Sequence, residues 1–247
     1  MQVDEYRKLA ELESEMWYFD ALHRRIMFPL SPFYGQVARL LDTGCGTGGL
    51  IRALRRANPQ WHITGLDFSA LACSIARQTT DAEIVEGSIT ALPFEDASFE
   101  ILTCADVLSH ISDGNLALRE FSRVLRPGGV LVINVAAYQW MWSYHDDAVQ
   151  TRHRYRRSEL VRMVKDCGLI PFQASYANMI IFPLIIARRK VLPPMAPTSD
   201  VQTYSPLVDS FCGGMAEVEY QWLKRGGSFP TGCSVFLAAR KPLDPEL

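Results

Sequence analysis

The sequence VARLLDTGCGTGGLIRALRRANPQWHITGLD, residues 37–67, predicts a strand, a glycine-rich turn, a helix and a second strand. The first apolar run ends at Asp42 and the second ends at Asp67. Glycines let the turn bend sharply and approach a ligand, because they carry no Cβ. The free N–H groups of the following helix then point at that ligand. This is the layout of a nucleotide-binding βαβ unit, in which Asp67 would accept hydrogen bonds from both ribose hydroxyls.

Two glycine patterns fit the turn, and they predict different ligands. Gly44, Gly46 and Gly49 fit the pattern of dinucleotide-binding enzymes. Asp42 followed by Gly44, Gly46 and Gly48 fits another pattern, in which an acid precedes alternating glycines. A carboxylate at that point attracts an ammonium or sulfonium group and repels a pyrophosphate. The turn alone leaves both kinds of cofactor open.

Composition narrows the class of protein. At 247 residues, 48% of them hydrophobic, the chain predicts one large α/β domain or a domain with a cap. A formal net charge of −2 does not favour a nucleic-acid partner. The cysteines form no CxxC pair and predict buried thiols in a reducing compartment: Cys45, Cys73, Cys104, Cys167, Cys212 and Cys233.

No segment of the sequence predicts membrane attachment or export. The apolar run over 179–187 contains a proline and is too short to span a bilayer. The acidic, helical pattern of the first residues is not that of a signal peptide. We therefore expect a cytoplasmic protein with no membrane partner, either monomeric or dimeric.

Apolar runs along the chain predict a Rossmann-like, doubly wound α/β fold. The expected strands begin near residues 37, 61, 82, 99, 130, 170 and 233, and helical patterns separate most of them. This alternation is typical of a largely parallel sheet. The expected helices cover 70–78 after Ser69 as N-cap, 113–126 before Pro127, 159–167 after Ser158, and part of 206–225. Residues 169–186 would form one or two strands, and 193–204 a proline-rich surface loop.

The N-terminal segment has two open interpretations. Residues 3–29 show helical spacing of apolar side chains and predict a helix or helix pair. Within it, Trp17, Tyr18 and Phe19 precede Arg24 and Arg25. The aromatic rings would either pack on the sheet or form a lid that excludes water from a ligand.

Four motifs in order carry a family resemblance: LLDTGCGTGGL, GLDFS, LPFEDASFEILTCADVLSHI and LREFSRVLRPGGVLVINV. The chain resembles class I S-adenosylmethionine (SAM)-dependent methyltransferases, in the methyltransferase-11/12/23-like group of bacterial small-molecule enzymes. WYFDALHRR near the N-terminus resembles a segment of some of these enzymes. A nicotinamide enzyme is not expected to carry LRPGG before its fifth strand. The resemblance implies an antiparallel last strand in a seven-stranded sheet, a helical lid over 1–30, and a SAM-binding domain over 31–247 with substrate-loop insertions around 138–157 and 190–230.

The resemblance also implies roles by position. Asp42 and the alternating glycines would hold the methionine part of SAM, Asp67 the ribose, and Phe68 an adenine face. Ser88 stands where many relatives have an acid, and its hydroxyl would bind the adenine amine. The implied cofactor-binding set is Asp42, Gly44, Cys45, Gly46, Gly48, Asp67, Phe68, Ser69, Gly87, Ser88, Ile89, Ala105, Asp106, His110 and Tyr18. S-adenosylhomocysteine (SAH) would be the product.

An aromatic and charged stretch over 138–157 predicts the acceptor site, because it follows the carboxyl end of an expected central strand. A hydroxyl acceptor would need a general base, whereas a nitrogen or carbon nucleophile needs little help. His145 is the first candidate base, with Tyr144 beside it, and His110 is a second candidate that is expected to line the site. His153 is a further candidate on the same stretch. The aromatic side chains predict an apolar or aromatic small-molecule substrate, and an amine is also possible.

The charged residues of this stretch have simpler interpretations as well. His145, Asp146, Asp147 and His153 match no metal-ligand spacing, so we expect no metal. Four arginines would either bind an acidic substrate group or form a solvated face: Arg152, Arg154, Arg156 and Arg157.

The leading hypothesis is methyl transfer from SAM to an oxygen, nitrogen or carbon atom of a small molecule, in the biosynthesis of a secondary metabolite. One alternative is a SAM-fold protein that catalyses a pericyclic reaction or a decarboxylation. Others are an NAD(P)-dependent oxidoreductase and a SAM-binding regulatory subunit without turnover. Labelled-methyl transfer and cofactor-dependent thermal stabilisation separate them.

Overall fold

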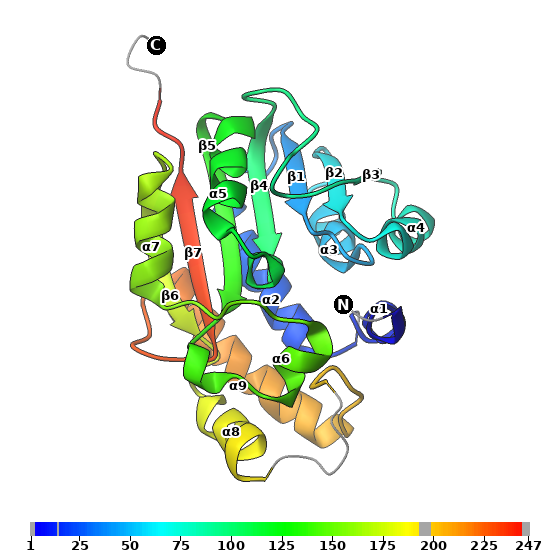
Figure 1. Ribbon diagram of the computed structural model, residues 1–247, viewed down its shortest axis with the longest axis vertical. Coiled ribbons are helices and arrows are strands. Elements are labelled where there is room, and N and C mark those ends of the chain that lie inside the picture. Colours follow the sequence, from blue (N-terminus) through cyan, green and yellow to red (C-terminus); the bar gives the residue numbers. More distant parts are fainter. Residues whose placement is uncertain (1–2, 14, 193–198, 244–247) are drawn as a thin grey trace.

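The computed structural model describes residues 3–13, 15–192 and 199–243. Within these residues, seven strands form one sheet in the order β3-β2-β1-β4-β5-β7-β6 (Figure 1). The strands are β1 (Arg39–Thr43), β2 (His62–Asp67), β3 (Glu83–Glu86), β4 (Phe99–Ala105), β5 (Leu125–Ala136), β6 (Ile170–Ala177) and β7 (Ser234–Arg240).

Neighbouring strands from β3 to β5 are parallel, and β7 runs antiparallel between β5 and β6. The predicted mostly parallel sheet with its antiparallel last strand is confirmed. The helices are α1 (Val3–Leu12), α2 (Trp17–Met27), α3 (Gly49–Ala57), α4 (Ala70–Thr79), α5 (Gly114–Val124), α6 (Tyr144–Val149), α7 (Arg157–Asp166), α8 (Phe182–Ile186) and α9 (Pro206–Lys224). Short turns η1 (Phe28–Phe33), η2 (Leu108–His110), η3 (Gln139–Met141) and η4 (Ala187–Val191) join them; η4 is π-helical.

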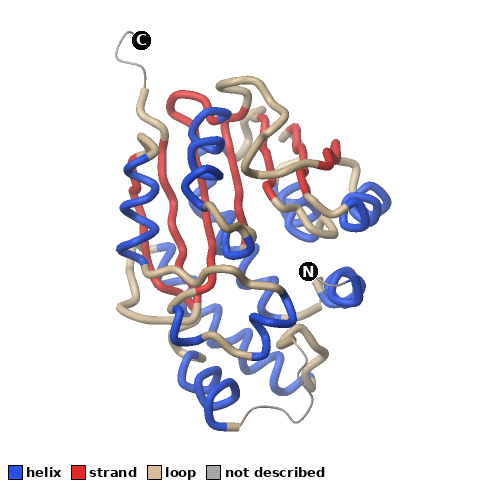
Figure 2. Tube along the Cα trace, viewed as in Figure 1, coloured by secondary structure: helices blue, strands red, loops and turns tan. Residues whose placement is uncertain are grey.

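Helices cover both faces of the sheet (Figure 2). Successive apolar side chains of a strand point to opposite faces, so both faces need such a cover. Leu40 of β1 joins a core with α2, α3 and α4, whereas the next residue, Leu41, joins a core with α5 and α7. Trp61 is fully buried at the start of β2. The apolar runs predicted from the sequence therefore form two cores, one on each face of the sheet.

The N-terminal segment both packs on the sheet and lines a cavity, so it has features of the core helix and of the lid. Phe19, Leu22 and Ile26 of α2 are buried in the core on one sheet face. Tyr6 and Leu9 of α1 line a cavity, and the aromatic residues Trp17, Tyr18 and Phe19 of α2 line the same cavity. The domain boundary at residue 30 stays a prediction. Helix α2, which precedes this boundary, packs in the same core as the sheet.

Three local boundaries differ from the sequence-based expectation. The helix expected to reach Arg126 ends at Val124, because Pro127 disfavours helical backbone before it and Leu125 already pairs with Phe99. Ser158 does not cap α7: the helix begins at Arg157, and Glu159 Oε2 accepts the amide of Arg156 at 3.2 Å.

The third difference lies in 169–186, where only the first half is a strand. The second half forms α8, with Pro183 in its first turn, where its missing N–H costs no helical hydrogen bond. Ser69 caps α4 as predicted, since its Oγ accepts the amide of Ala72. Of the loop predicted over 193–204, residues 193–198 lie outside the described residues.

The carboxyl ends of the parallel strands point to one edge of the sheet, toward a cap of α1, α6, α8 and α9 (Figure 1). Open α/β sheets bind ligands at that edge. Among the described residues, no helix is both long enough and apolar enough to cross a membrane.

Candidate functional site

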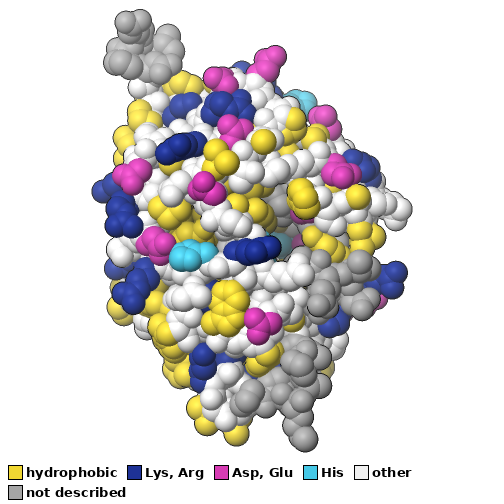
Figure 3. Space-filling model, viewed as in Figure 1, with side chains coloured by type: hydrophobic (Ala, Val, Ile, Leu, Met, Phe, Trp, Pro, Cys, Tyr) yellow, Lys and Arg dark blue, Asp and Glu magenta, His cyan; other side chains and the backbone are white. Residues whose placement is uncertain are grey.

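A cavity of about 800 Å³ lies between the carboxyl edge of the sheet and the cap. Figure 3 shows a recess near the middle of this face, bordered by apolar side chains and a cationic one. The sheet side is formed by the glycine turn and the residues after β2, β3 and β4. The cap side is formed by α6, η4 and the residues before α9. The cavity thus joins two regions of different chemistry.

The glycine turn is held tightly against β2 and the residue after β4. The amides of Gly44 and Cys45 both donate to the carbonyl of Leu66, at 2.6 and 3.0 Å. Gly44 has φ +74°, and a Cβ there would lie 2.1 Å from Cγ2 of Val107. Only glycine fits this position without displacing its neighbours.

Asp42 presents an unpaired carboxylate oxygen to this part of the cavity. Its side chain is buried, with 2% exposure, and Oδ1 accepts a hydrogen bond from Thr103 Oγ1 at 2.7 Å. Oδ2 has no hydrogen-bond partner among the described residues. Burial, opposed by the hydrogen bond from Thr103 and reinforced by the charges of Glu13 and Asp67, raises the pKa of Asp42 to about 7. A cationic ligand group would satisfy Oδ2 and favour the ionised form.

Asp67 ties the end of β2 to the glycine turn. Its Oδ2 accepts the amide of Gly46 and its Oδ1 the amide of Ser69, both at 2.9 Å. Phe68 follows with 82% of its side chain exposed, and it lines the cavity together with Ser88. An exposed aromatic ring at the rim is free to cover a planar ligand.

A buried hydrogen-bonded chain closes the region after β4. Tyr18 donates its hydroxyl to Asp106 Oδ2 at 2.6 Å, and Asn134 Nδ2 donates to Oδ1 at 2.7 Å. The Arg25 guanidinium donates to the side-chain oxygens of Asn134 and Asn178. Asp106 has φ +63°, a conformation that costs energy for a residue with a Cβ. Helix α2 therefore fixes the position of a cavity carboxylate.

The predicted catalytic residues separate in space. His145 and His110 line the cavity, and Tyr144 is not among its lining residues. The Tyr144 hydroxyl instead donates to Asp200 Oδ1 at 2.7 Å. His153 Nε2 lies 2.8 Å from Glu159 Oε1, outside the cavity lining.

His110 and His145 have opposite hydrogen-bonding patterns. Nδ1 of His110 lies 3.3 Å from the carbonyl of Gln150, which only accepts, so Nδ1 carries the hydrogen and Nε2 the lone pair. Nδ1 of His145 accepts the amide of Asp200 at 3.1 Å, so in the neutral ring Nε2 carries the hydrogen. Burial lowers the pKa of both histidines, and that of His145 falls to about 4.

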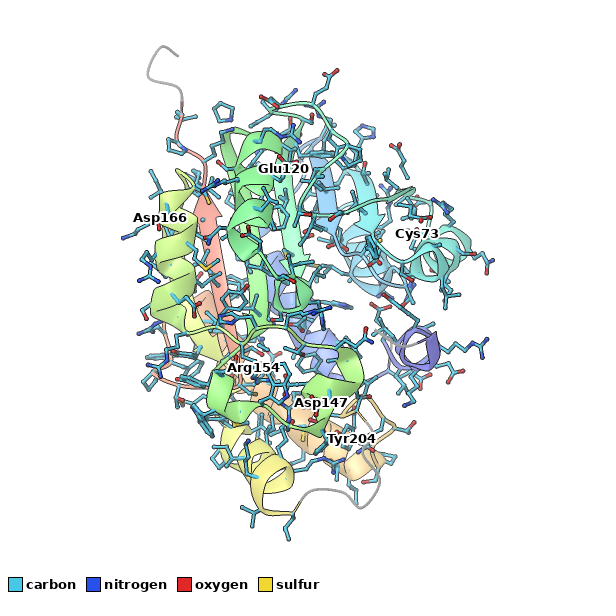
Figure 4. All side chains as sticks on the ribbon, viewed as in Figure 1. Cys73, Glu120, Asp147, Arg154, Asp166 and Tyr204 are labelled. Atoms are coloured by element: carbon cyan, nitrogen blue, oxygen red, sulfur yellow. The ribbon has the colours of Figure 1, made fainter. Side chains whose placement is uncertain are left out.

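Arg154 does not lie on a solvated face. Its Nη1 is 2.7 Å from Asp146 Oδ1, with 2% and 1% of the two side chains exposed. Figure 4 places Arg154 between the sheet and α6. The guanidinium also donates to the carbonyls of Ala137 and Tyr138, so this ion pair fixes the 138–157 stretch to the end of β5.

Sequence reasoning named none of the cavity residues from 184–204, although Asp200 and Tyr204 lie within the substrate-loop insertion predicted around 190–230. Arg188, Arg189, Asp200 and Tyr204 all line the cavity, and Tyr204 lies on the cap side in Figure 4. For Arg188 and Arg189 the signal was a pair of arginines after an apolar run. No group of three or more His, Cys, Asp or Glu side chains in the described part of the chain is placed to hold a metal ion.

Comparisons with known proteins agree with this geometry. The family model described as a methyltransferase domain matches residues 41–133. Demethylmenaquinone methyltransferase from Staphylococcus aureus is 38% identical over 99 residues, which cover 38% of this chain and 41% of that protein. The chain thus spans less than half the length of this curated relative.

Solved structures share the fold across nearly the whole chain. A chain from the complex of the Haloferax volcanii Trm112 methyltransferase activator with a methyltransferase aligns with a TM-score of 0.64 and 22% identity, covering 96% of this chain and 98% of that one. The cyclase SpnF aligns with a TM-score of 0.60 and 21% identity, covering 90% and 81%. The chain thus contains a methyltransferase domain at residues 41–133, and its sheet has the fold of these solved structures.

Proposed function

We propose that this protein transfers a methyl group from SAM to an oxygen, nitrogen or carbon atom of a small molecule, in the biosynthesis of a secondary metabolite. The observation that carries the proposal is the unpaired, buried Oδ2 of Asp42 beside a glycine turn that lines a cavity. An ammonium group, which SAM carries on its methionine part, satisfies that oxygen. A pyrophosphate would meet an unscreened carboxylate, which disfavours a nicotinamide dinucleotide.

The other residues on the sheet side fit the remaining parts of SAM. Asp67 is placed to bind the ribose hydroxyls, Phe68 to cover one adenine face, and Ser88 to contact the adenine edge. Tyr6 and Leu9 of α1 cover this region from the opposite side. When bound, SAM supplies an activated methyl group on a sulfonium. The chain's own contribution is to orient that group and keep water away from it.

Methyl-labelled SAM tests the proposal directly. We expect calorimetry to detect SAM binding, and a pool of small apolar acceptors to yield labelled product together with SAH. We expect Asp67→Ala to weaken SAM binding by about 1–3 kcal/mol through lost hydrogen bonds. SAM binding without labelled product or SAH would favour a non-methylating reaction, of which the structurally similar SpnF, a cyclase, is an example. Unchanged affinity in Asp67→Ala would overturn the ribose assignment.

We propose that His110, not His145, accepts the proton when the acceptor is a hydroxyl. Only His110 has its lone pair on the nitrogen that does not face a backbone partner. We expect His110→Gln to lower kcat roughly 100-fold with a smaller change in KM, since a positioned base contributes ~10²–10⁴. We expect His145→Gln to change KM more than kcat. A larger kcat loss in His145→Gln than in His110→Gln would contradict this assignment.

A further inference from the structure

The cap side of the cavity carries a compact polar cluster, which we call the donor pole: His145, Arg188, Arg189 and Asp200. His145 lies on α6, the two arginines lie on η4, and Asp200 lies in the segment before α9. All four side chains line the cavity. The hydrogen bonds within this cluster determine what kind of ligand group it can still bind.

Asp200 has no remaining capacity to accept a hydrogen bond from a ligand. Its Oδ1 accepts from Tyr144 at 2.7 Å and from Arg188 Nε at 3.3 Å. Its Oδ2 accepts from Nε and Nη2 of Arg189, at 2.8 and 2.7 Å. Burial raises the pKa of Asp200, but Arg189, His145 and the hydrogen bond from Tyr144 together lower it to about 2, so the carboxylate stays ionised. One negative charge is thus shared between two guanidinium groups.

The cluster therefore keeps one positive charge and several unused N–H donors. The next ion pair, Asp146 with Arg154, is neutral as a unit and adds no net charge. His145 contributes an N–H at Nε2, because its Nδ1 accepts the amide of Asp200. A guanidinium has five N–H donors, and the hydrogen bonds of Arg188 to Asp200 and Tyr144 use two of them.

Apolar side chains surround the donor pole. Ile181, Leu184 and Ile185 line the cavity from the α8 region, and Val149 and Val201 line it from α6 and the segment before α9. This wall favours a ligand with an apolar body, since burying apolar surface contributes about 25 cal/mol per Å². Unused donors in such a wall remain costly unless a ligand accepts from them.

We propose that the donor pole binds a carboxylate carried by an apolar methyl acceptor, with Arg188 as the main contact. The inference rests on the proposed function for the acceptor's role, and the binding itself does not require turnover. A carboxylate matches the parallel N–H groups of a guanidinium and neutralises the single spare charge. At the donor pole an amine would meet a positive field, because the Asp200 carboxylate is already paired, and a neutral apolar molecule would leave the donors unpaired.

Paired ligands test the charge preference. Calorimetry in saturating SAH would compare 2-naphthoate, 4-phenylbutanoate and decanoate, each with its primary amide. We expect at least one acid to bind about tenfold or more tightly than its amide, the factor that one charge-assisted hydrogen bond provides. We expect Arg188→Met to abolish this preference and Arg188→Lys to retain part of it. Arg119→Met, an exposed arginine on α5 outside the cavity, is the matched control.

The outcomes separate this inference from the proposed function. No acid–amide preference in any of the three pairs, with SAH bound normally, overturns the carboxylate assignment alone. An acid preference that persists unchanged in Arg188→Met overturns the role of Arg188. Failure of SAM and SAH to bind overturns the proposed function, and the same ligand pairs measured without SAH still report on the donor pole.

Discussion

Replacing Arg154 with methionine is expected to lower the free energy of unfolding by about 3–5 kcal/mol, the cost of breaking a buried ion pair. Asp146 would keep a charge in a site where it is 1% exposed, and the carbonyls of Ala137 and Tyr138 would lose a donor. Urea denaturation followed by circular dichroism measures this change. Methionine retains much of the arginine stem, so lost packing contributes little to it.

An exposed ion pair between α2 and α9 provides the control. Arg24 lies 2.6 Å from Glu217, with 46% and 41% of the two side chains exposed, and we expect Arg24→Met to cost less than about 1 kcal/mol. The double variant Arg154→Met/Asp146→Leu is expected to recover part of the loss, because no charge is left unpaired. If Arg154→Met cost no more than Arg24→Met, the buried pair would not be what fixes the 138–157 stretch.

Replacing Gly44 with alanine is expected to lower the free energy of unfolding by about 2–5 kcal/mol and to abolish measurable SAM binding. The left-handed backbone at φ +74° costs a residue with a Cβ roughly 1–2 kcal/mol. The overlap with Val107, at 2.1 Å, adds roughly 1–3 kcal/mol of overpacking. Denaturation and calorimetry measure the two effects separately.

Gly168 isolates the backbone contribution, because it has φ +80° with no atom within 4 Å of a built Cβ. We expect Gly168→Ala to cost only the conformational part, and Gly44→Ala/Val107→Ala to regain the packing part. Equal losses in Gly44→Ala and Gly168→Ala would show that contact with Val107 does not constrain the turn.

The fold followed from the sequence because its signals are local. Leu40 and Leu41 face opposite cores, and runs of such residues mark each central strand. The glycine turn and the acids at the strand ends mark the sheet edge without reference to the rest of the chain. The antiparallel direction of the last strand came from the family resemblance, since periodicity does not report strand direction.

The cap side of the site could not be derived in the same way. Asp200 binds Tyr144 and the ring of His145, more than 50 positions earlier, and no periodic pattern connects such residues. The choice between His110 and His145 depends on which ring nitrogen meets a backbone carbonyl or amide, which is a property of the folded loops. Neither interpretation of Arg154, as a ligand for an acidic substrate group or as part of a solvated face, included the buried ion pair with Asp146, although this partner lies only eight residues away.

The position of β7 affects how this chain can fold while it is being translated. Strand β7 follows every other strand in sequence, yet it lies between β5 and β6 and provides the only sheet partner of β6 among the described strands. Translation of the residues between Ala136 and Ser234 takes on the order of ten seconds at ~5–20 residues per second. During that time the apolar edge of β5 is open to pairing with other nascent chains. We therefore expect chaperones that bind extended apolar segments to associate with the emerging chain until β7 leaves the ribosome.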